Sequence, residues 1–212
     1  MKNDYIEKIN EGERRYFSPQ IEVRADDEKM IEGIASVVDH EYDLGYFSER
    51  IARGAFDDVL GNDVVALFNH DNNYPLARTG AEGDGNLKLY LNDNGDLAYS
   101  FKIPNTSIGR DLAENIKNGV IRQSSFAFTI ESEEWEFAND KNKLDMDRRT
   151  ITKIKRLYDV SPVTFPASPS TTVAARNAER LHEEDENVKH KIKLDKYNRD
   201  KYYRNKFKNN GK

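Results

Sequence analysis

Short apolar runs with the spacing of strands occur throughout residues 21–163, and their distribution limits the possible folds more than any other feature. The clearest runs, which are predicted to form strands, are Met30–Val38, Val64–Phe68, Val120–Ile130 and Thr150–Val160. These runs do not alternate regularly with helical segments, as the strands of a parallel α/β sheet would. The sequence therefore predicts an α+β domain or a partly closed barrel rather than a parallel sheet.

Two helices and a hairpin are expected between these strands. Thr106 or Ser107 is expected to cap a helix that runs through Asn118. A second helical segment is expected around Ala55–Leu60. Residues 86–103 predict a hairpin, because the turn-forming tetrad Asn-Asp-Asn-Gly separates two strand-like runs.

The charge pattern divides the chain into three parts. Residues 176–212 contain 19 charged side chains among 37 residues, so we expect a charged tail outside the folded core. Nine Lys or Arg and two Asp fall within residues 191–212, which gives this part +7 and leaves −12 for the rest of a chain of net charge −5. Residues 1–20 are polar and irregular and are expected to form a flexible N-terminal arm, so the domain is expected over residues 21–175.

Composition excludes several classes of site. The sequence has no cysteine, so it forms no disulfide and no thiolate metal site. Neither a His-x-His nor a His-Glu-x-x-His spacing occurs, and we expect no metal and no cofactor. No segment approaches the ~20 apolar residues of a membrane span, and the charged opening does not resemble a signal peptide. We therefore expect a protein that does not engage a membrane and stays in a cytoplasm.

His70 is the histidine best placed for chemistry. It follows the buried run Val64–Phe68 directly, where a packed strand would fix the backbone and let the side chain project into the loop space. His182 and His190 lie in the charged tail and are expected at the surface, and His40 stands between two acidic residues. Taken alone, a histidine at a strand end can equally be structural, and the residue pattern leaves both roles open.

Ser124 and Ser125 form a hydroxyl pair inside an apolar strand. Ser125 alternates with Phe126 and Phe128, so its side chain is expected on the opposite face of the strand. It is a candidate nucleophile if that face lines a groove, and an ordinary strand residue if the face meets water. No Gly-x-Ser-x-Gly sequence occurs, so an α/β-hydrolase arrangement is not expected.

Two carboxylates compete as the partner of His70. Asp159 lies at the end of the strand predicted over Thr150–Val160, and Asp71 follows His70 directly. Adjacent side chains of an extended chain point apart, so Asp71 is the poorer choice. Asp159 is therefore the preferred candidate.

Five segments together resemble the prohead maturation proteases of tailed phages, which are distant relatives of the herpesvirus capsid proteases. They are Gly54-Ala55-Phe56, Leu67-Phe68-Asn69-His70-Asp71, Pro75-Leu76-Ala77-Arg78, Ser125-Phe126-Ala127-Phe128 and Asp159-Val160-Ser161-Pro162-Val163-Thr164-Phe165-Pro166-Ala167. They occur in the family's order and at about its spacing. Ala77 and Ala127 depart from the family pattern, because each stands where glycine is usual.

The resemblance implies a catalytic role for three residues. His70 matches the family's general base, Ser125 its nucleophile and Asp159 the acidic third member. Ser124 remains an alternative nucleophile, and the oxyanion donors remain open between backbone amides near the serine and Arg78. The implied fold is a small, mainly antiparallel β-barrel flanked by helices, of the herpesvirus-protease type.

The same resemblance implies a serine endopeptidase that acts inside the assembling prohead, in the host cytoplasm. Its expected substrates are the scaffold or the scaffolding arm of the major capsid protein, and the protease itself. The tail over residues 176–212 would then bind scaffold or be removed by self-cleavage. A homodimer is expected, because related capsid proteases act as dimers.

Two other functions are compatible with the sequence. The chain could be a catalytically inactive capsid assembly or scaffold protein that keeps the protease fold. It could also bind nucleic acid through the basic tail, where the aromatic residues Tyr197, Tyr202, Tyr203 and Phe207 lie among Lys and Arg. The acidic remainder of the chain would repel phosphates, so nucleic acid is expected as a partner only through that tail.

Overall fold

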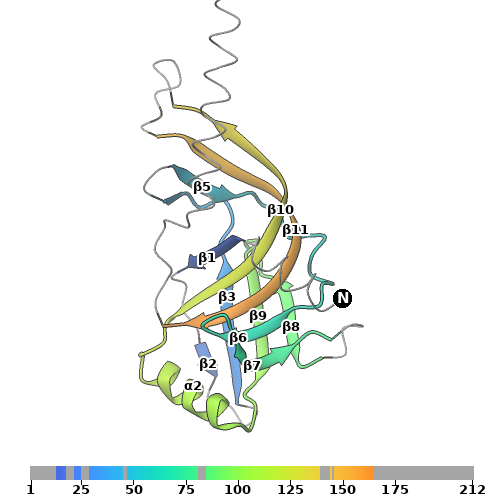
Figure 1. Ribbon diagram of the computed structural model, residues 1–212, viewed down its shortest axis with the longest axis vertical. Coiled ribbons are helices and arrows are strands. Elements are labelled where there is room, and N and C mark those ends of the chain that lie inside the picture. Colours follow the sequence, from blue (N-terminus) through green and yellow to red (C-terminus); the bar gives the residue numbers. More distant parts are fainter. Residues whose placement is uncertain are drawn as a thin grey trace, which may run out of the picture. The chain divides into compact units, whose positions relative to one another are not determined.

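The structure is a computed structural model that describes residues 13–17, 22–24, 29–44, 47–80, 85–138, 144 and 146–164 (Figure 1). The described strands are β1 (Glu13–Phe17), β2 (Glu22–Arg24), β3 (Met30–Ser36), β4 (Tyr42–Asp43), β5 (Ser48–Ile51), β6 (Val65–Phe68), β7 (Asp71–Arg78), β8 (Leu87–Leu91), β9 (Leu97–Lys102), β10 (Gln123–Glu136) and β11 (Arg148–Val163). The described helix is α2 (Ser107–Lys117). The predicted tail over residues 176–212 lies outside the described residues.

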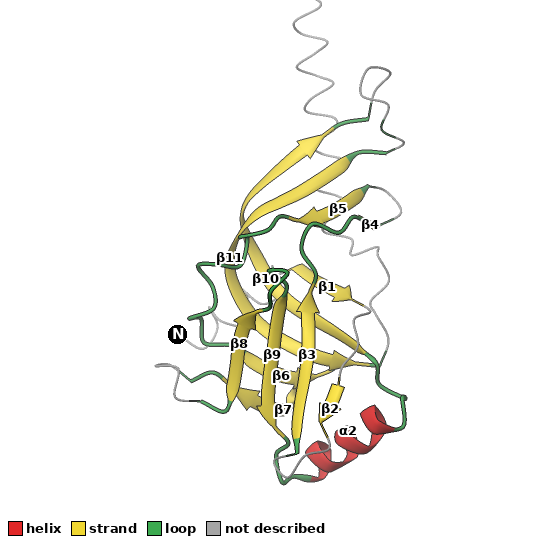
Figure 2. Cartoon of the chain, turned by 180° about the vertical axis from the view of Figure 1, so that it is seen from behind, coloured by secondary structure: helices red, strands yellow, loops and turns green. Residues whose placement is uncertain are grey.

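The strands form two sheets. The larger sheet has the order β1-β10-β11-β5-β4, with β6 also paired to β11 and β7 paired to β6. Strands β5 and β6 run parallel to β11, whereas the other described pairs are antiparallel. The smaller sheet has the order β2-β3-β9-β8. Figure 2 shows β3, β8 and β9 of the smaller sheet crossing over β6 and β10 of the larger one.

The main hydrophobic core lies between the two sheets. Ile31 of β3 and Phe101 of β9 belong to the same buried cluster as Phe126 of β10 and Val160 of β11. In β3, β9 and β10 the core residues fall at alternate positions, which is the period of a strand with one face on the core. In β11 they are three residues apart, at Ile151, Ile154, Leu157 and Val160, because its ladder with β10 contains register shifts. The alternation seen in the sequence therefore gives each sheet its inner face.

The prediction of a mainly stranded α+β domain is confirmed. The barrel expected from the family resemblance is not found: among the described residues, the two sheets remain separate and no closed barrel forms. Strands β2 and β8 stay at the edges of the smaller sheet, since no described ladder joins them to the larger one. The two sheets bury their apolar faces by packing on each other rather than by closure.

The hairpin and the capped helix are confirmed. Strands β8 and β9 pair across residues 92–95, where the side chain of Asn92 accepts hydrogen bonds from the backbone of Asn94 and Asp96. Helix α2 begins after Thr106, whose side chain accepts a hydrogen bond of 3.1 Å from the backbone N–H of Gly109. In the part of the chain that the structure describes, no helix is long and apolar enough to cross a membrane.

The segment around Ala55–Leu60 differs from the predicted helix. It is a series of turns closed by hydrogen bonds between residues three apart, such as Asp57 N to Gly54 O and Val59 N to Phe56 O. Three of its side chains, those of Ala55, Phe56 and Val59, are buried in the core. Such turns repeat every three residues and bury one side, so their sequence pattern is close to that of an amphipathic helix.

The N-terminal arm predicted over residues 1–20 is corrected for one stretch. Residues Glu13–Phe17 form β1, which pairs antiparallel with β10 from Ser124 to Phe128. The backbone of β1 thus forms a ladder with the edge of β10, which a sequence without strong local strand signals does not reveal. The rest of that segment lies outside the described residues.

Candidate active site

His70 lies in the tight turn that joins β6 to β7. Phe68 pairs with Asp71 across the turn, which leaves Asn69 and His70 as its two central residues. Both have positive φ angles, 55° for Asn69 and 58° for His70. Two-residue hairpin turns of the I′ class need positive φ at both central positions, where Asn and Gly are preferred. A histidine in this conformation costs ~1–3 kcal/mol and is found where the surrounding structure enforces it.

The turn is fixed to the end of β11 by three hydrogen bonds of Asn69. Its backbone N–H donates to the carbonyl of Pro162 over 3.0 Å. Its side-chain oxygen accepts from the backbone N–H of Thr164 at 2.8 Å, and its side-chain nitrogen donates to the Thr164 hydroxyl at 3.2 Å. These bonds offset the strain of the turn and hold His70 against the larger sheet.

Strands β10 and β11 bring the other polar residues onto one face. Ser125 pairs with Ser161 and Ala127 pairs with Asp159 in the antiparallel ladder. Residues directly opposite each other share a face, and so do residues two apart in one strand. Ser125, Asp159 and Ser161 therefore project from the same face. Because β6 pairs with β11 at Asp159, the turn that follows β6 carries His70 to this face.

A continuous chain of hydrogen bonds links the three candidate residues. His70 Nδ1 lies 2.5 Å from Asp159 Oδ1, and His70 Nε2 lies 2.5 Å from Ser125 Oγ. The side chains of His70 and Asp159 are only 3% and 7% exposed. A carboxylate at Nδ1 fixes the tautomer in which Nδ1 carries the proton and Nε2 is free to accept one from a serine hydroxyl. The arrangement can therefore activate Ser125 as a nucleophile.

Ser161 is a fourth polar residue in contact with this chain. Its hydroxyl donates to Asp159 Oδ1 at 2.8 Å and lies 3.2 Å from His70 Nδ1. Sequence reasoning named Asp159 and gave no role to Ser161. The signal was present, because a residue two positions further along a strand lies on the same face.

Ser124 lies on the other face of β10. Its hydroxyl is 2.7 Å from the hydroxyl of Tyr99, a fully buried residue of β9. Burial raises the pKa of Tyr99, while its hydrogen bond with Ser124 acts in the opposite direction. The ring of Tyr99 packs on Gly33, where an added Cβ would come within 2.6 Å of the ring. Ser124 thus belongs to the polar contacts of the core and not to those of His70.

The other sequence candidates lie apart from the hydrogen-bonded chain. The carboxylate of Asp71 accepts hydrogen bonds from the backbone and side chain of Asn73. Arg78 binds the carboxylate of Asp63 through Nε and Nη2, and this pairing lowers the pKa of Asp63. His40 is exposed and stacks edge-on against Tyr42, with 4.5 Å between ring centroids. His182 and His190 lie outside the described residues.

Comparison with known proteins identifies the family. A family model described as caudovirus prohead serine protease matches residues 19–186. The chain belongs to this family. The resemblance to prohead proteases predicted from the five sequence segments is therefore confirmed, and with it membership of a family of serine proteases of phage capsid maturation.

Among individual proteins, a solved structure is similar to this chain. No curated protein matches its sequence. The solved structure is that of the bacteriophage T4 capsid assembly protease gp21, with 13% sequence identity and a TM-score of 0.41. The match covers 73% of this chain and 99% of the T4 chain.

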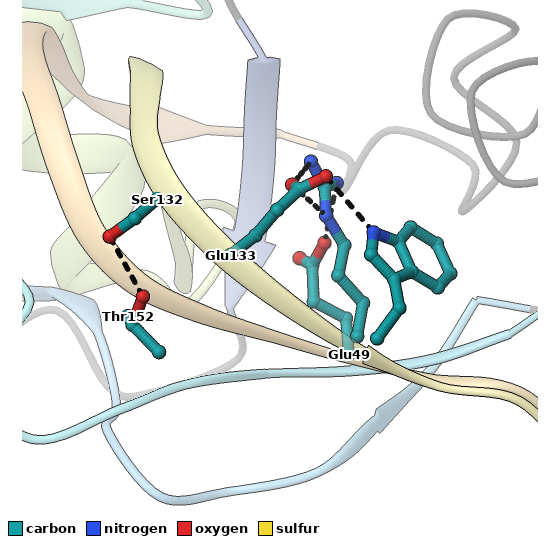
Figure 3. Close-up of polar contacts among 6 residues, drawn as sticks. Glu49, Ser132, Glu133 and Thr152 are labelled. Carbon is teal, nitrogen blue, oxygen red and sulfur yellow. Dashed lines mark hydrogen bonds and ion pairs between the residues drawn. The ribbon is translucent and has the colours of Figure 1, made fainter. Parts of the chain in front are cut away.

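The chain also contains a partly buried polar cluster, here called the Arg149 cluster: Arg149, Glu49, Glu133 and Trp135. Figure 3 shows Glu49 and Glu133 within this cluster. Arg149 donates to Glu49 at 3.0 Å and to Glu133 at 2.7 Å. Trp135 donates to the same Glu133 at 3.0 Å, and its ring centroid lies 5.7 Å from the Arg149 guanidinium carbon. The side chains of Arg149 and Glu49 are each 3% exposed. The cluster links the C-terminal half of β10 and the N-terminal half of β11 to β5, so we interpret it as structural.

Proposed function

We propose that this chain is an active serine endopeptidase in which Ser125 is the nucleophile, His70 the general base and Asp159 the residue that orients His70. The observation that carries the proposal is the unbroken series of hydrogen bonds from Asp159 through His70 to Ser125. A serine hydroxyl is a weak nucleophile until a base within hydrogen-bond reach takes its proton. The three side chains have the order and the contacts that this activation needs.

The proposed reaction proceeds by acyl transfer. His70 Nε2 takes the proton of Ser125 while Oγ attacks the scissile carbonyl carbon and forms a tetrahedral intermediate. The imidazolium then gives this proton to the leaving amine, and the acyl-enzyme remains on Ser125. Water attacks the ester in the second half, with His70 again acting as base. Asp159 holds the proton on Nδ1 and stabilises the charged imidazolium throughout.

Backbone N–H groups near Ser125 are the proposed donors to the oxyanion. Arg78, the other candidate, uses its guanidinium group to bind Asp63. The backbone around Ser125 is paired with β1 and β11, so either donor would have to give up a present partner. Loss of one oxyanion donor lowers the catalytic rate by ~10²–10³-fold, so the identity of the donor can be tested by rate measurements.

The proposed substrates are those that the resemblance to prohead proteases implies. They are the scaffold or the scaffolding arm of the major capsid protein, and the protease itself, cleaved inside the assembling prohead in the host cytoplasm. The tail over residues 176–212 is proposed to bind scaffold or to be removed by self-cleavage. A homodimer and a herpesvirus-protease-like fold remain part of this proposal.

Co-expression with the cognate capsid protein tests the proposal. The wild-type chain, Ser125→Ala and the matched control Ser124→Ala are each expressed with it, and all products are measured by intact mass. We expect defined truncations with wild type and Ser124→Ala and none with Ser125→Ala. Truncation by Ser125→Ala would assign the reaction to another nucleophile. No truncation by any variant would favour the alternative, a catalytically inactive capsid assembly or scaffold protein.

A further inference from the structure

Ser161 combines complete burial with two contacts to the candidate active site. Its exposed fraction is 0%. In the ladder it lies directly opposite Ser125, the proposed nucleophile. Its hydroxyl reaches Asp159 Oδ1 at 2.8 Å and His70 Nδ1 at 3.2 Å, so it contacts both residues that are proposed to activate Ser125.

We infer that Ser161 is a positioning residue of the active site, which holds the Asp159 carboxylate in the orientation that His70 needs. The inference rests on the proposed function, since it assigns a role within the same reaction. Ser161 acts through Asp159 and touches neither the substrate nor the attacking atom. It is therefore not a further member of the proton-transfer chain.

The geometry at Asp159 Oδ1 supports this role. Two groups meet at that one oxygen: the Ser161 hydroxyl, which donates to it, and His70 Nδ1. An ionised carboxylate oxygen has two lone pairs and can accept both hydrogen bonds. Two donors from different directions restrict rotation of the carboxylate about its own bond. The oxygen facing His70 is thus kept in place.

Burial makes the second donor important. Asp159 is 5% exposed, and a buried carboxylate without sufficient hydrogen bonds is strongly destabilised. Ser161 supplies a donor from within the same strand, two residues along β11, and its short side chain keeps the hydroxyl close to the strand backbone. Without the hydroxyl, the carboxylate would turn to find another donor and its hydrogen bond with His70 would weaken.

The test compares Ser161→Ala with Ser124→Ala in the full chain. Both replacements remove a fully buried serine hydroxyl that has a hydrogen-bonded partner, and they lie on the paired strands β11 and β10. Ser124 bonds to Tyr99 in the core, so its replacement controls for the general effect of losing such a bond. Ser161→Ala adds no atom to the packed interior, so both proteins are expected to fold.

The first readout is the rate at which a fluorophosphonate probe modifies Ser125, followed by intact mass. A hydrogen bond to a charged group corresponds to about a 10- to 100-fold effect, so we expect Ser161→Ala to react that much more slowly than wild type. Ser124→Ala is expected to react at the wild-type rate. Equal rates for Ser161→Ala and wild type would overturn the inference.

The second readout is the proton NMR signal of His70 Nδ1–H, which is shifted far downfield when the group is hydrogen-bonded to a carboxylate. We expect the signal to move upfield or disappear in Ser161→Ala and to persist in Ser124→Ala. This readout does not need an active enzyme. If wild type fails to react with the probe, the proposed function fails, while an unchanged NMR signal in Ser161→Ala overturns the positioning role itself.

Discussion

Ser124 and Ser125 are consecutive residues of β10, yet their hydroxyl groups form hydrogen bonds on opposite faces of the larger sheet. Ser124 bonds to Tyr99 between the two sheets, and Ser125 bonds to His70 on the other face. Successive side chains of a strand alternate between its faces, so the two hydroxyls cannot serve the same site. One serine belongs to the core and the other to the candidate active site.

Replacing the two serines is expected to separate stability from activity. Ser124→Ala leaves the Tyr99 hydroxyl buried without this partner, so we expect a loss of ~1–3 kcal/mol in the free energy of unfolding and little change in activity. Ser125→Ala is expected to abolish probe labelling while the chain stays folded. Denaturant unfolding and fluorophosphonate labelling measure the two effects. Loss of labelling in a folded Ser124→Ala protein would contradict this division.

The strained turn at His70 predicts that a glycine at this position gives a more stable protein than an alanine. The φ of 58° at His70 suits glycine and is unfavourable for any residue with a Cβ. His70→Gly and His70→Ala lose the same side-chain hydrogen bonds, so their difference reports the backbone strain less the greater unfolded-state entropy of glycine. We expect the glycine variant to be more stable by about 1 kcal/mol. Urea unfolding of both proteins measures the difference, and a more stable alanine variant would show that the turn is relaxed.

The pairing of Asp63 with Arg78 predicts that part of the folding stability is lost at acidic pH. The Arg78 hydrogen bond lowers the pKa of Asp63 in the folded chain. Its stabilising contribution is therefore complete above the usual aspartate pKa of about 4 and is lost as the pH falls through the lower folded value. Both side chains are partly exposed, at 28% and 57%, so solvent screening keeps the contribution below about 1 kcal/mol.

Unfolding measurements between about pH 5 and pH 2 test this contribution. We expect wild type to lose more stability over that interval than Asp63→Asn, in which the carboxylate is absent. Arg78→Gln should reduce the pH dependence in the same way, because it removes the partner that lowers the pKa. Parallel curves for wild type and both variants would mean that the ion pair contributes nothing.

The position of β1 beside Ser125 predicts that substrates have restricted access to this residue. The exposed fraction of Ser125 is 0%, so a substrate can reach it only after neighbouring groups move. The register of β1 on β10 places Tyr16 directly opposite Ser125. We expect deletion of residues 1–17 to raise the rate of fluorophosphonate labelling. A time course of intact mass measures that rate, with Ser125→Ala in the shortened chain as the control for reaction elsewhere. An unchanged or slower rate would mean that β1 supports β10 without limiting access.

Local sequence patterns accounted for much of the secondary structure. The alternation in Val120–Ile130 predicted the first half of β10, and that in Thr150–Val160 predicted most of β11. The capping signal at Thr106 predicted the start of α2. The pattern failed at Ala55–Leu60, where repeated turns bury the same spacing of side chains as a helix. It also gave no indication of β1, whose ladder depends on the edge of β10 that it meets.

The sequence by itself indicated most of the long strands, helix α2, the family and the three candidate residues His70, Ser125 and Asp159. Only the tertiary structure decided which of them meet, because the contacts span 55 residues from His70 to Ser125 and 89 residues from His70 to Asp159. Strand alternation fixes the face on which a side chain lies, but the partner across the ladder depends on register, which is set by packing of the whole sheet. For this reason the contacts of Ser124 with Tyr99 and of Asp159 with His70, and the place of Ser161 beside them, are decided only by the fold.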